Sequence, residues 1–178
     1  MAISMAINLD SLFLSRRVRQ NHALEHATTT ILTGMIPDLS ISARSSADGF
    51  IFFGDVDLGL LRRATDDALR RLQAGEAELA IHPDCDINMA VGMSLITLGA
   101  FFSLASNGKR TRIVAAAVSC MTGLMAARSV GNYIQRHFAT LSDLTDVRVT
   151  EIARRKFFGF TFMEVRTAGK VHLEHDVM

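Results

Sequence analysis

Residues 87–106, INMAVGMSLITLGAFFSLAS, form a run of twenty residues without a charged side chain. An α-helix rises about 1.5 Å per residue, so this run would extend roughly 30 Å, which is the thickness of the hydrocarbon core of a bilayer. A short basic turn follows at residues 107–112, and residues 113–127 are again uncharged. The apolar character then continues to Ile134. These features predict a two-helix transmembrane hairpin over residues 87–134.

The second of these segments carries a small residue at every fourth position. Positions four apart lie on one face of a helix, where small side chains allow a neighbouring backbone to approach closely. This small-residue seam consists of Ala115, Ser119, Gly123, Ala127 and Gly131. We expect it to serve as a docking surface for a membrane protein complex or for a second copy of this chain.

The alternative to a membrane hairpin is a buried helical hairpin in a soluble core. Such a hairpin would show polar residues every three or four positions on a solvent face. The polar residues of the first segment are instead all small: Asn88, Ser94, Thr97, Ser103 and Ser106. Arg128 is compatible with a membrane because an arginine near a helix end can extend to the headgroups. The pattern therefore favours the membrane.

The composition of the 178-residue chain fits a small membrane protein. Its hydrophobic content is 49%, its net charge is +1, and it contains no Trp. Because the positive charges are scattered, a nucleic acid is not expected as a partner. Residues 1–14 have no basic group ahead of their apolar residues, so a signal peptide is not expected. Cys85 and Cys120 are not expected to pair, since Cys120 would lie inside the membrane.

The segments on either side of the hairpin predict helices and short strands. Apolar residues three and four apart indicate a helix over residues 15–33, and Asp57 is a suitable N-cap for a second helix ending near Gln73. Apolar runs between turn-forming residues indicate five short strands. The predicted strands are residues 39–44, 50–54, 78–82, 146–152 and 157–165. The last two are predicted to pair around a turn at residues 153–156.

The expected fold class is therefore α+β, a small mixed helix/sheet domain attached to a two-helix transmembrane hairpin. The expected division is an N-terminal α+β region over residues 1–86, the hairpin over residues 87–134 and a C-terminal β-hairpin region over residues 135–178. The C-terminal region is expected to pack with the N-terminal region, and its strands could join the three earlier ones in one small sheet.

The first predicted helix contains the sequence HALEH at residues 22–26. Positions three and four apart share a helix face, so His22, Glu25 and His26 would point the same way. Two histidines at i and i+4 can hold one zinc ion, and Glu25 could act as general base on a zinc-bound water. The order is that of the inverted zincin motif, H-x-x-E-H. The alternative is that both histidines are ordinary helix-surface residues beside Glu25.

A zinc site of this kind needs a third protein ligand. The candidates lie in the sequence HPDC at residues 82–85. Either His82 or Cys85 would suit zinc and leave a fourth position for water, and Asp84 is a poorer choice. A second His/Glu cluster at residues 172–175 is interpreted as part of a solvated tail.

The HALEH sequence resembles the inverted zinc motif of the pitrilysin-type metallopeptidases. In that family both histidines are zinc ligands, the glutamate between them is the general base, and a further glutamate well downstream completes the site. The resemblance implies that His22 and His26 bind zinc and that Glu25 is catalytic. It covers this helix alone, and residues 87–134, near which the downstream ligand would fall, contain no glutamate.

Most of the chain is similar to an uncharacterised family of small bacterial membrane proteins. The features that carry this resemblance are an N-H-A-x-E-H-A helix at residues 21–27, a small-sheet region, an H-P-x-C stretch at residues 82–85 and the apolar pair that follows. The resemblance implies a bacterial source and a multi-pass location in the inner membrane. It implies no particular activity.

Two functional hypotheses follow from the sequence. The first is a membrane-anchored, zinc-dependent hydrolase of peptidase-like type, which contacts the lipid bilayer and binds zinc through the histidine pair with His82 or Cys85. The second is a non-catalytic accessory or assembly subunit of a larger membrane complex, docked through the small-residue seam. They differ in their demand on Glu25, which only the hydrolase requires for turnover.

Overall fold

The computed structural model describes residues 15–54, 56–104 and 108–169 of the chain. The predictions made for residues 1–14 and 172–175 lie outside these ranges. The described residues fall into two compact units, and the second of them is Ile81–His137. The first unit comprises the described residues up to Ala80 and those from Phe138 onward. The predicted division of the chain at residues 86/87 and 134/135 stays a prediction.

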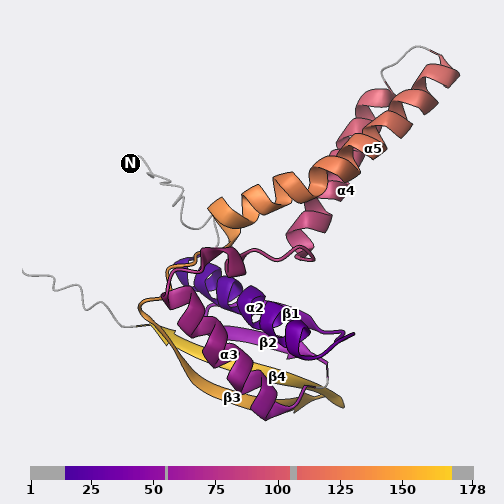
Figure 1. The fold of residues 1–178 in the computed structure, drawn as a ribbon. Coiled ribbons are helices and arrows are strands. Elements are labelled where there is room, and N and C mark those ends of the chain that lie inside the picture. The colour runs from indigo at the N-terminus through magenta and orange to yellow at the C-terminus, as the bar shows by residue number, and fades with distance from the viewer. Residues whose placement is uncertain (1–14, 55, 105–107, 170–178) are drawn as a thin grey trace, which may run out of the picture. The chain divides into compact units, whose positions relative to one another are not determined.

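Two helices form one layer of the first unit (Figure 1), α2 (Arg16–Met35) and α3 (Leu58–Gln73). The Ser15 hydroxyl accepts a hydrogen bond from the Val18 N–H at 3.4 Å at the start of α2. Asp57 does the same for α3, since its Oδ1 accepts from the Leu60 N–H at 2.9 Å. Such caps satisfy backbone donors that the first helical turn leaves without a partner. The two predicted helices are thereby confirmed.

The other layer of the first unit is a four-stranded antiparallel sheet of order β1-β2-β4-β3. Its strands are β1 (Ser42–Ser46), β2 (Gly49–Phe53), β3 (Val147–Phe157) and β4 (Phe160–Gly169). The central pairing joins β2 to β4 and sets Phe50 opposite Val165. Segments about a hundred residues apart in the sequence thus share one sheet, and the α+β class is confirmed.

Two details of the predicted strands are wrong. Residues 78–82 form no strand, because Ala77–Ala80 is a 3-10 helix, which begins four residues after the end of α3 at Gln73. The turn between β3 and β4 is not at the basic residues 153–156, which continue the ladder opposite β4. It lies at Phe158 and Gly159, whose φ angles are +46° and +85°. A two-residue hairpin turn requires positive φ, which glycine adopts without strain.

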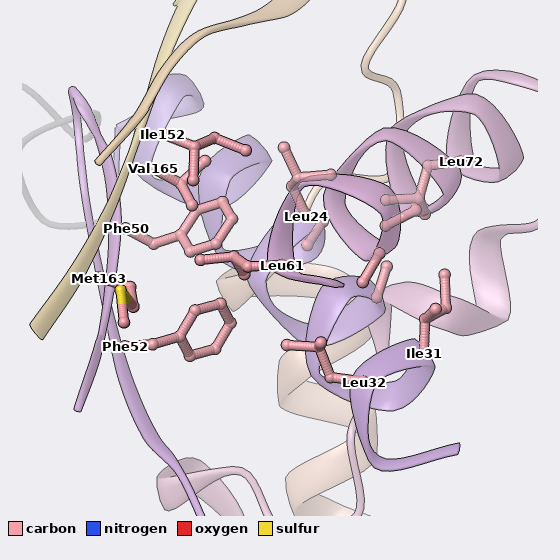
Figure 2. Packing of buried hydrophobic residues seen from close by; sticks show 14 of the residues in the cluster. Leu24, Ile31, Leu32, Phe50, Phe52, Leu61, Leu72, Ile152, Met163 and Val165 are labelled. Carbon is pink, nitrogen blue, oxygen red and sulfur yellow. The ribbon is translucent and has the colours of Figure 1, made fainter. Parts of the chain in front are cut away.

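The hydrophobic core lies between the sheet and the two helices (Figure 2). Phe50, Phe52, Met163 and Val165 project from the inner face of β2 and β4 and are at most 2% exposed. They pack in one cluster with apolar residues of both helices, among them Leu24, Leu32 and Leu61. Burying a side chain of this size stabilises a fold by about 1.5–3 kcal/mol relative to leaving it exposed. This core fixes α2, on which the histidine pair lies.

The second unit is a helical hairpin of α4 (Asp86–Ser103) and α5 (Lys109–Ile134), which continues into a π-helix at Gln135–Ala139. The small-residue seam packs inside this hairpin. A β-carbon added to Gly99 of α4 would lie 2.4 Å from Ser119 Cβ, and one added to Gly123 would lie 2.9 Å from Ile96 Cγ1. Docking of a partner or second copy through the seam stays a prediction.

The outward side chains of the hairpin are large and apolar. Phe101 and Phe102 on α4 are 68% and 64% exposed, and Met125 on α5 is 77% exposed. Large exposed apolar patches are typical of surfaces that contact a membrane or another protein. Both helical segments are long and apolar enough to cross a membrane, the first with 18 residues and the second, Lys109–Ala139, with 31.

We expect Gly99→Leu to lower the thermal stability of the detergent-solubilised protein. The added side chain would overlap Ser119, and overpacking of this kind costs about 1–3 kcal/mol. The matched control is Gly34→Ala on α2, where no atom lies within 4 Å of the added carbon, so the melting temperature should stay level or rise. An unchanged melting temperature for Gly99→Leu would contradict the close packing of α4 on α5.

Candidate metal site

The HALEH sequence lies near the middle of α2 on a face that is mostly buried. His26 is 3% exposed and Glu25 is 7% exposed, while His22 is half-buried. Polar groups at such depth are costly unless they are bonded. The exposure values therefore do not fit the alternative in which these are ordinary helix-surface residues.

Each histidine of the pair has its Nδ1 on a backbone carbonyl. His22 Nδ1 lies 3.1 Å from the Ala139 oxygen, and His26 Nδ1 lies 2.8 Å from the Ala80 oxygen. A carbonyl oxygen can only accept, so each Nδ1 must carry the hydrogen and donate it. In the neutral ring the lone pair is then on Nε2, which is the nitrogen that can bind a metal ion.

The two imidazoles are close enough to share one ion. Their ring centroids are 4.2 Å apart at an interplanar angle of 60°. A ring nitrogen of His22 and one of His26 lie within 4.8 Å of each other. The i, i+4 spacing on α2 thus brings two ring nitrogens together, as the sequence predicts.

The two accepting carbonyls belong to the points where the chain leaves and re-enters the first unit. Ala80 is the last residue of this unit before the hairpin, and Ala139 is the second residue after it. The histidines therefore bind both crossing points to α2. The backbone N–H of Leu141 also donates to the Arg19 carbonyl at 3.0 Å, which attaches the returning chain one turn earlier on the helix.

Glu25 is held from β1. The Ser45 hydroxyl donates to Glu25 Oε2 at 2.5 Å. Asn21, one turn earlier on α2, holds the adjoining β-turn, because its Nδ2 donates to the carbonyls of Ser46 at 2.8 Å and Ala47 at 3.1 Å. Its Oδ1 accepts from the Thr167 hydroxyl of β4 at 2.6 Å. This network orients the carboxylate on the same helix as the histidine pair.

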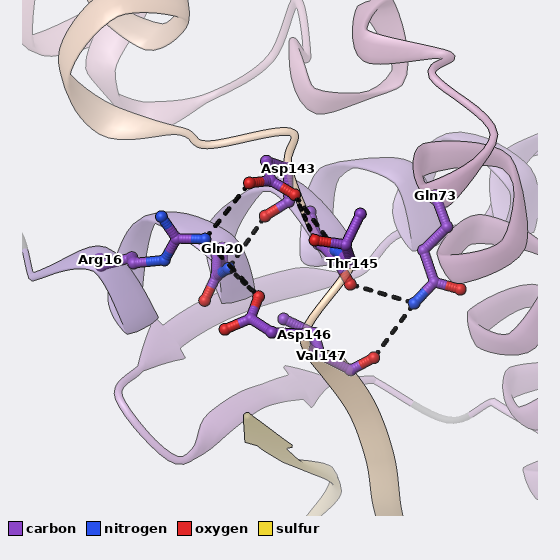
Figure 3. Close-up of polar contacts among 8 residues, drawn as sticks. Arg16, Gln20, Gln73, Asp143, Thr145, Asp146 and Val147 are labelled. Carbon is purple, nitrogen blue, oxygen red and sulfur yellow. Dashed lines mark hydrogen bonds and ion pairs between the residues drawn. The ribbon is translucent and has the colours of Figure 1, made fainter. Parts of the chain in front are cut away.

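The segment between Ala139 and β3 is fixed by side-chain amides (Figure 3). Gln20 Nε2 donates to the Asp143 carbonyl at 2.9 Å and to Asp146 Oδ1 at 2.7 Å. Gln73 at the end of α3 donates to the carbonyls of Leu144 and Val147 at 3.0 and 3.1 Å. The pKa of Asp143 is lowered, mainly because the Thr145 hydroxyl and N–H donate to its carboxylate, and Arg16 adds to the effect.

Residues 82–85, here called the HPDC loop, belong to the second unit and precede α4. His82 Nδ1 accepts a hydrogen bond from the Asp84 N–H at 3.2 Å. Burial lowers the pKa of His82, an effect that the charge of Asp84 opposes. Cys85 is buried and is the N-cap residue of α4, where the helix dipole favours an anionic group. Neither Cys85 nor Cys120 forms a disulfide.

Comparison with known proteins assigns this chain to a family. Residues 17–152 match DUF6391, which is described as a domain of unknown function. The chain belongs to this family. The matched range includes the histidine pair, the HPDC loop and both helices of the hairpin.

One relative is an uncharacterized protein of Picosynechococcus sp. strain PCC 7002. It is 34% identical over an alignment of 134 positions, which covers 69% of this chain. The matched part spans 65% of that relative's length. No solved structure matches the chain.

Two kinds of residue at or near the site were not found from the sequence. Ser45 bonds Glu25 from twenty positions away, and serines in a turn-rich stretch give no signal of their own. Gln135 and Asn88 are almost completely buried in the second unit, at 0% and 8% exposed. The available signal was an uncharged amide at each open end of a long apolar hairpin, because a buried amide there needs hydrogen-bond partners.

We expect Asn21→Ala to destabilise the protein, because it removes the donor to the Ser46 and Ala47 carbonyls and the acceptor of the buried Thr167 hydroxyl. Each group left without a partner costs about 1–3 kcal/mol. The check is the melting temperature by circular dichroism. Thr33→Ala is the control on the same helix, since Thr33 is exposed and bonds back to its own helix. Equal melting temperatures for both variants would contradict the role of Asn21.

Proposed function

We propose that this chain is a membrane-anchored zinc protein in which α2 holds the ion through Nε2 of His22 and Nε2 of His26. The observation that carries the proposal is the pair of bonds from Nδ1 to the Ala139 and Ala80 carbonyls. Metal-binding histidines almost always donate their other ring N–H to such a partner, which fixes the tautomer and the ring orientation. Both rings of the pair make this bond, and a ring nitrogen of one lies within 4.8 Å of a ring nitrogen of the other.

Of the two candidate third ligands, the hydrogen bonds favour Cys85. His82 Nδ1 accepts from the Asp84 N–H, so in the neutral ring the hydrogen is on Nε2. In that tautomer Nε2 carries the hydrogen, and the lone pair of Nδ1 accepts the Asp84 N–H. At His22 and His26, by contrast, Nδ1 carries the hydrogen and the lone pair is on Nε2. A thiolate at Cys85 would complete a nitrogen and sulfur donor set of the kind zinc prefers, with a fourth position for water.

Chain connectivity allows this ligation. The Ala80 carbonyl accepts from His26, and Cys85 follows Ala80 by five residues. A chain extends at most about 3.6 Å per residue, so Cys85 lies within roughly 18 Å of Ala80 whatever the path.

The chemistry we propose for the site is hydrolysis, with Glu25 as the general base. The HALEH order is similar to the inverted motif of pitrilysin-type metallopeptidases, in which the glutamate has this role. Zinc would polarise the scissile carbonyl and lower the pKa of water. Glu25, oriented by the Ser45 hydroxyl, would take the proton from the attacking water and pass it to the leaving group.

We place the protein in a bacterial inner membrane with both helices of the hairpin spanning the bilayer. The exposed apolar side chains of α4 and α5 support this location, since lipid would cover them without a protein partner. The ends of the hairpin at Asn88 and Gln135 would then lie near the bilayer surface, together with the adjoining HPDC loop.

Metal content tests the first part of the proposal. Protein purified without an affinity tag should hold about one zinc per chain by mass spectrometry, and His22→Ala/His26→Ala should hold none. His137→Ala is the matched control, because His137 is exposed and lies outside the histidine pair, and it should retain the metal. Metal-free wild-type protein, or a double mutant that still binds zinc, would contradict the proposal.

Glu25→Gln tests the catalytic part. The variant should bind as much zinc as the wild type and hydrolyse a library of quenched fluorescent peptides about 10²–10⁴-fold more slowly, because the amide cannot accept a proton. Retained turnover would exclude Glu25 as the base. Zinc-loaded wild-type protein that cleaves no peptide in the library would contradict peptidase activity and leave zinc binding as the function.

A further inference from the structure

We propose that Gln135 and Asn88 form an amide clamp that positions Cys85 for the metal, so that the packing of α4 on α5 sets the metal affinity. This inference rests on the proposed zinc site and adds a positioning role for residues at the base of the hairpin. Its evidence lies within the second unit.

Gln135 binds both backbone groups of His82. Its Oε1 accepts from the His82 N–H at 3.0 Å, and its Nε2 donates to the His82 carbonyl at 3.2 Å. The Gln135 amide thus pairs with the N–H and the carbonyl of His82 as the backbone of a neighbouring strand would. Gln135 is 0% exposed, so the loop has no water to take over these bonds.

Asn88 in the first turn of α4 completes the clamp. Its Oδ1 accepts from Gln135 Nε2 at 2.8 Å, and its Nδ2 donates to the Pro83 carbonyl at 2.7 Å. A β-carbon at Gly131 of α5 would lie 2.0 Å from Asn88 Oδ1, so only glycine permits this approach of the two helices. The clamp therefore forms only when α4 and α5 are fully packed at this end.

The clamp acts on Cys85 through a short turn. The Cys85 N–H donates to the His82 carbonyl at 3.3 Å, the same oxygen that Gln135 binds. The Cys85 carbonyl in turn accepts from the Asn88 N–H at 2.8 Å. Both peptide groups of Cys85 are thus fixed relative to the two amides. Removing a group that orients a metal ligand by hydrogen bonds typically lowers the metal affinity 10- to 100-fold.

The backbone next to the clamp is also unusual. Gln135 is the first residue of the π-helix Gln135–Ala139, whose last residue provides the carbonyl that His22 binds. Single π-turns are rare and occur often at functional sites. The π-helix therefore begins with Gln135 of the clamp and ends with Ala139, whose carbonyl accepts from His22 Nδ1.

Cobalt substitution in the full-length, detergent-solubilised protein tests the clamp. Cobalt in the wild type should show a thiolate-to-metal charge-transfer band that Cys85→Ser lacks. Gln135→Leu, of similar size and without hydrogen bonds, should lose most of this band and bind cobalt about 10- to 100-fold more weakly. Gln135→Glu keeps an acceptor for the His82 N–H but sets a carboxylate oxygen against the His82 carbonyl and Asn88 Oδ1, so it should also lose most of the band.

Gln73→Leu is the matched control. It removes two hydrogen bonds from a glutamine amide to backbone carbonyls, those of Leu144 and Val147 in the segment that leads to β3 (Figure 3). It should keep the wild-type band and affinity. If Gln135→Leu behaves as Gln73→Leu does, the positioning role is overturned and the zinc site stands. If the wild type binds no cobalt, the proposed function itself fails. Cobalt bound without a thiolate band would exclude Cys85 as a ligand and overturn the clamp's role.

Discussion

Two hydrogen bonds, from the Nδ1 atoms of His22 and His26 to backbone carbonyls, are the constraint on which the site depends. They fix the tautomer of both rings, and with it the nitrogen that can bind an ion. They also attach the chain to α2 where it leaves for the hairpin and where it returns. Any change in the path of the backbone at Ala80 or Ala139 would therefore alter the ligand geometry.

The helix that carries these bonds is unusual in what it buries. Besides its apolar stripe, α2 buries five polar residues: Gln20, Asn21, Glu25, His26 and Thr28. A helix that served only to cover the sheet would gain more from apolar side chains, because a buried polar group stabilises little even when bonded. Most of these side chains bond to loops, turns or strands of the first unit, so α2 orders the irregular backbone around the site.

The elements with local signals could be predicted from the sequence. The hairpin follows from the absence of charge over residues 87–106, and α3 follows from the Asp57 cap. The errors arose where the local structure depends on contacts with residues far away in the sequence. Residues 153–156 look like a polar turn, yet they pair with β4 along the ladder, and Arg155 forms an ion pair with Glu164 of the facing strand. At the site, the ligand types followed from the i, i+4 spacing, whereas Ser45 and Gln135 act across 20 and 53 residues of chain.

The first coordination shell of the bound ion is the most direct test of the account. X-ray absorption at the zinc edge of the membrane-reconstituted protein should resolve imidazole scattering at about 2.0–2.1 Å from two histidines and a single sulfur at about 2.3 Å. That result would show that one ion joins the histidine pair of α2 to the cysteine of the HPDC loop. A shell of oxygen atoms without imidazole or sulfur scattering would mean adventitious metal and would contradict the account.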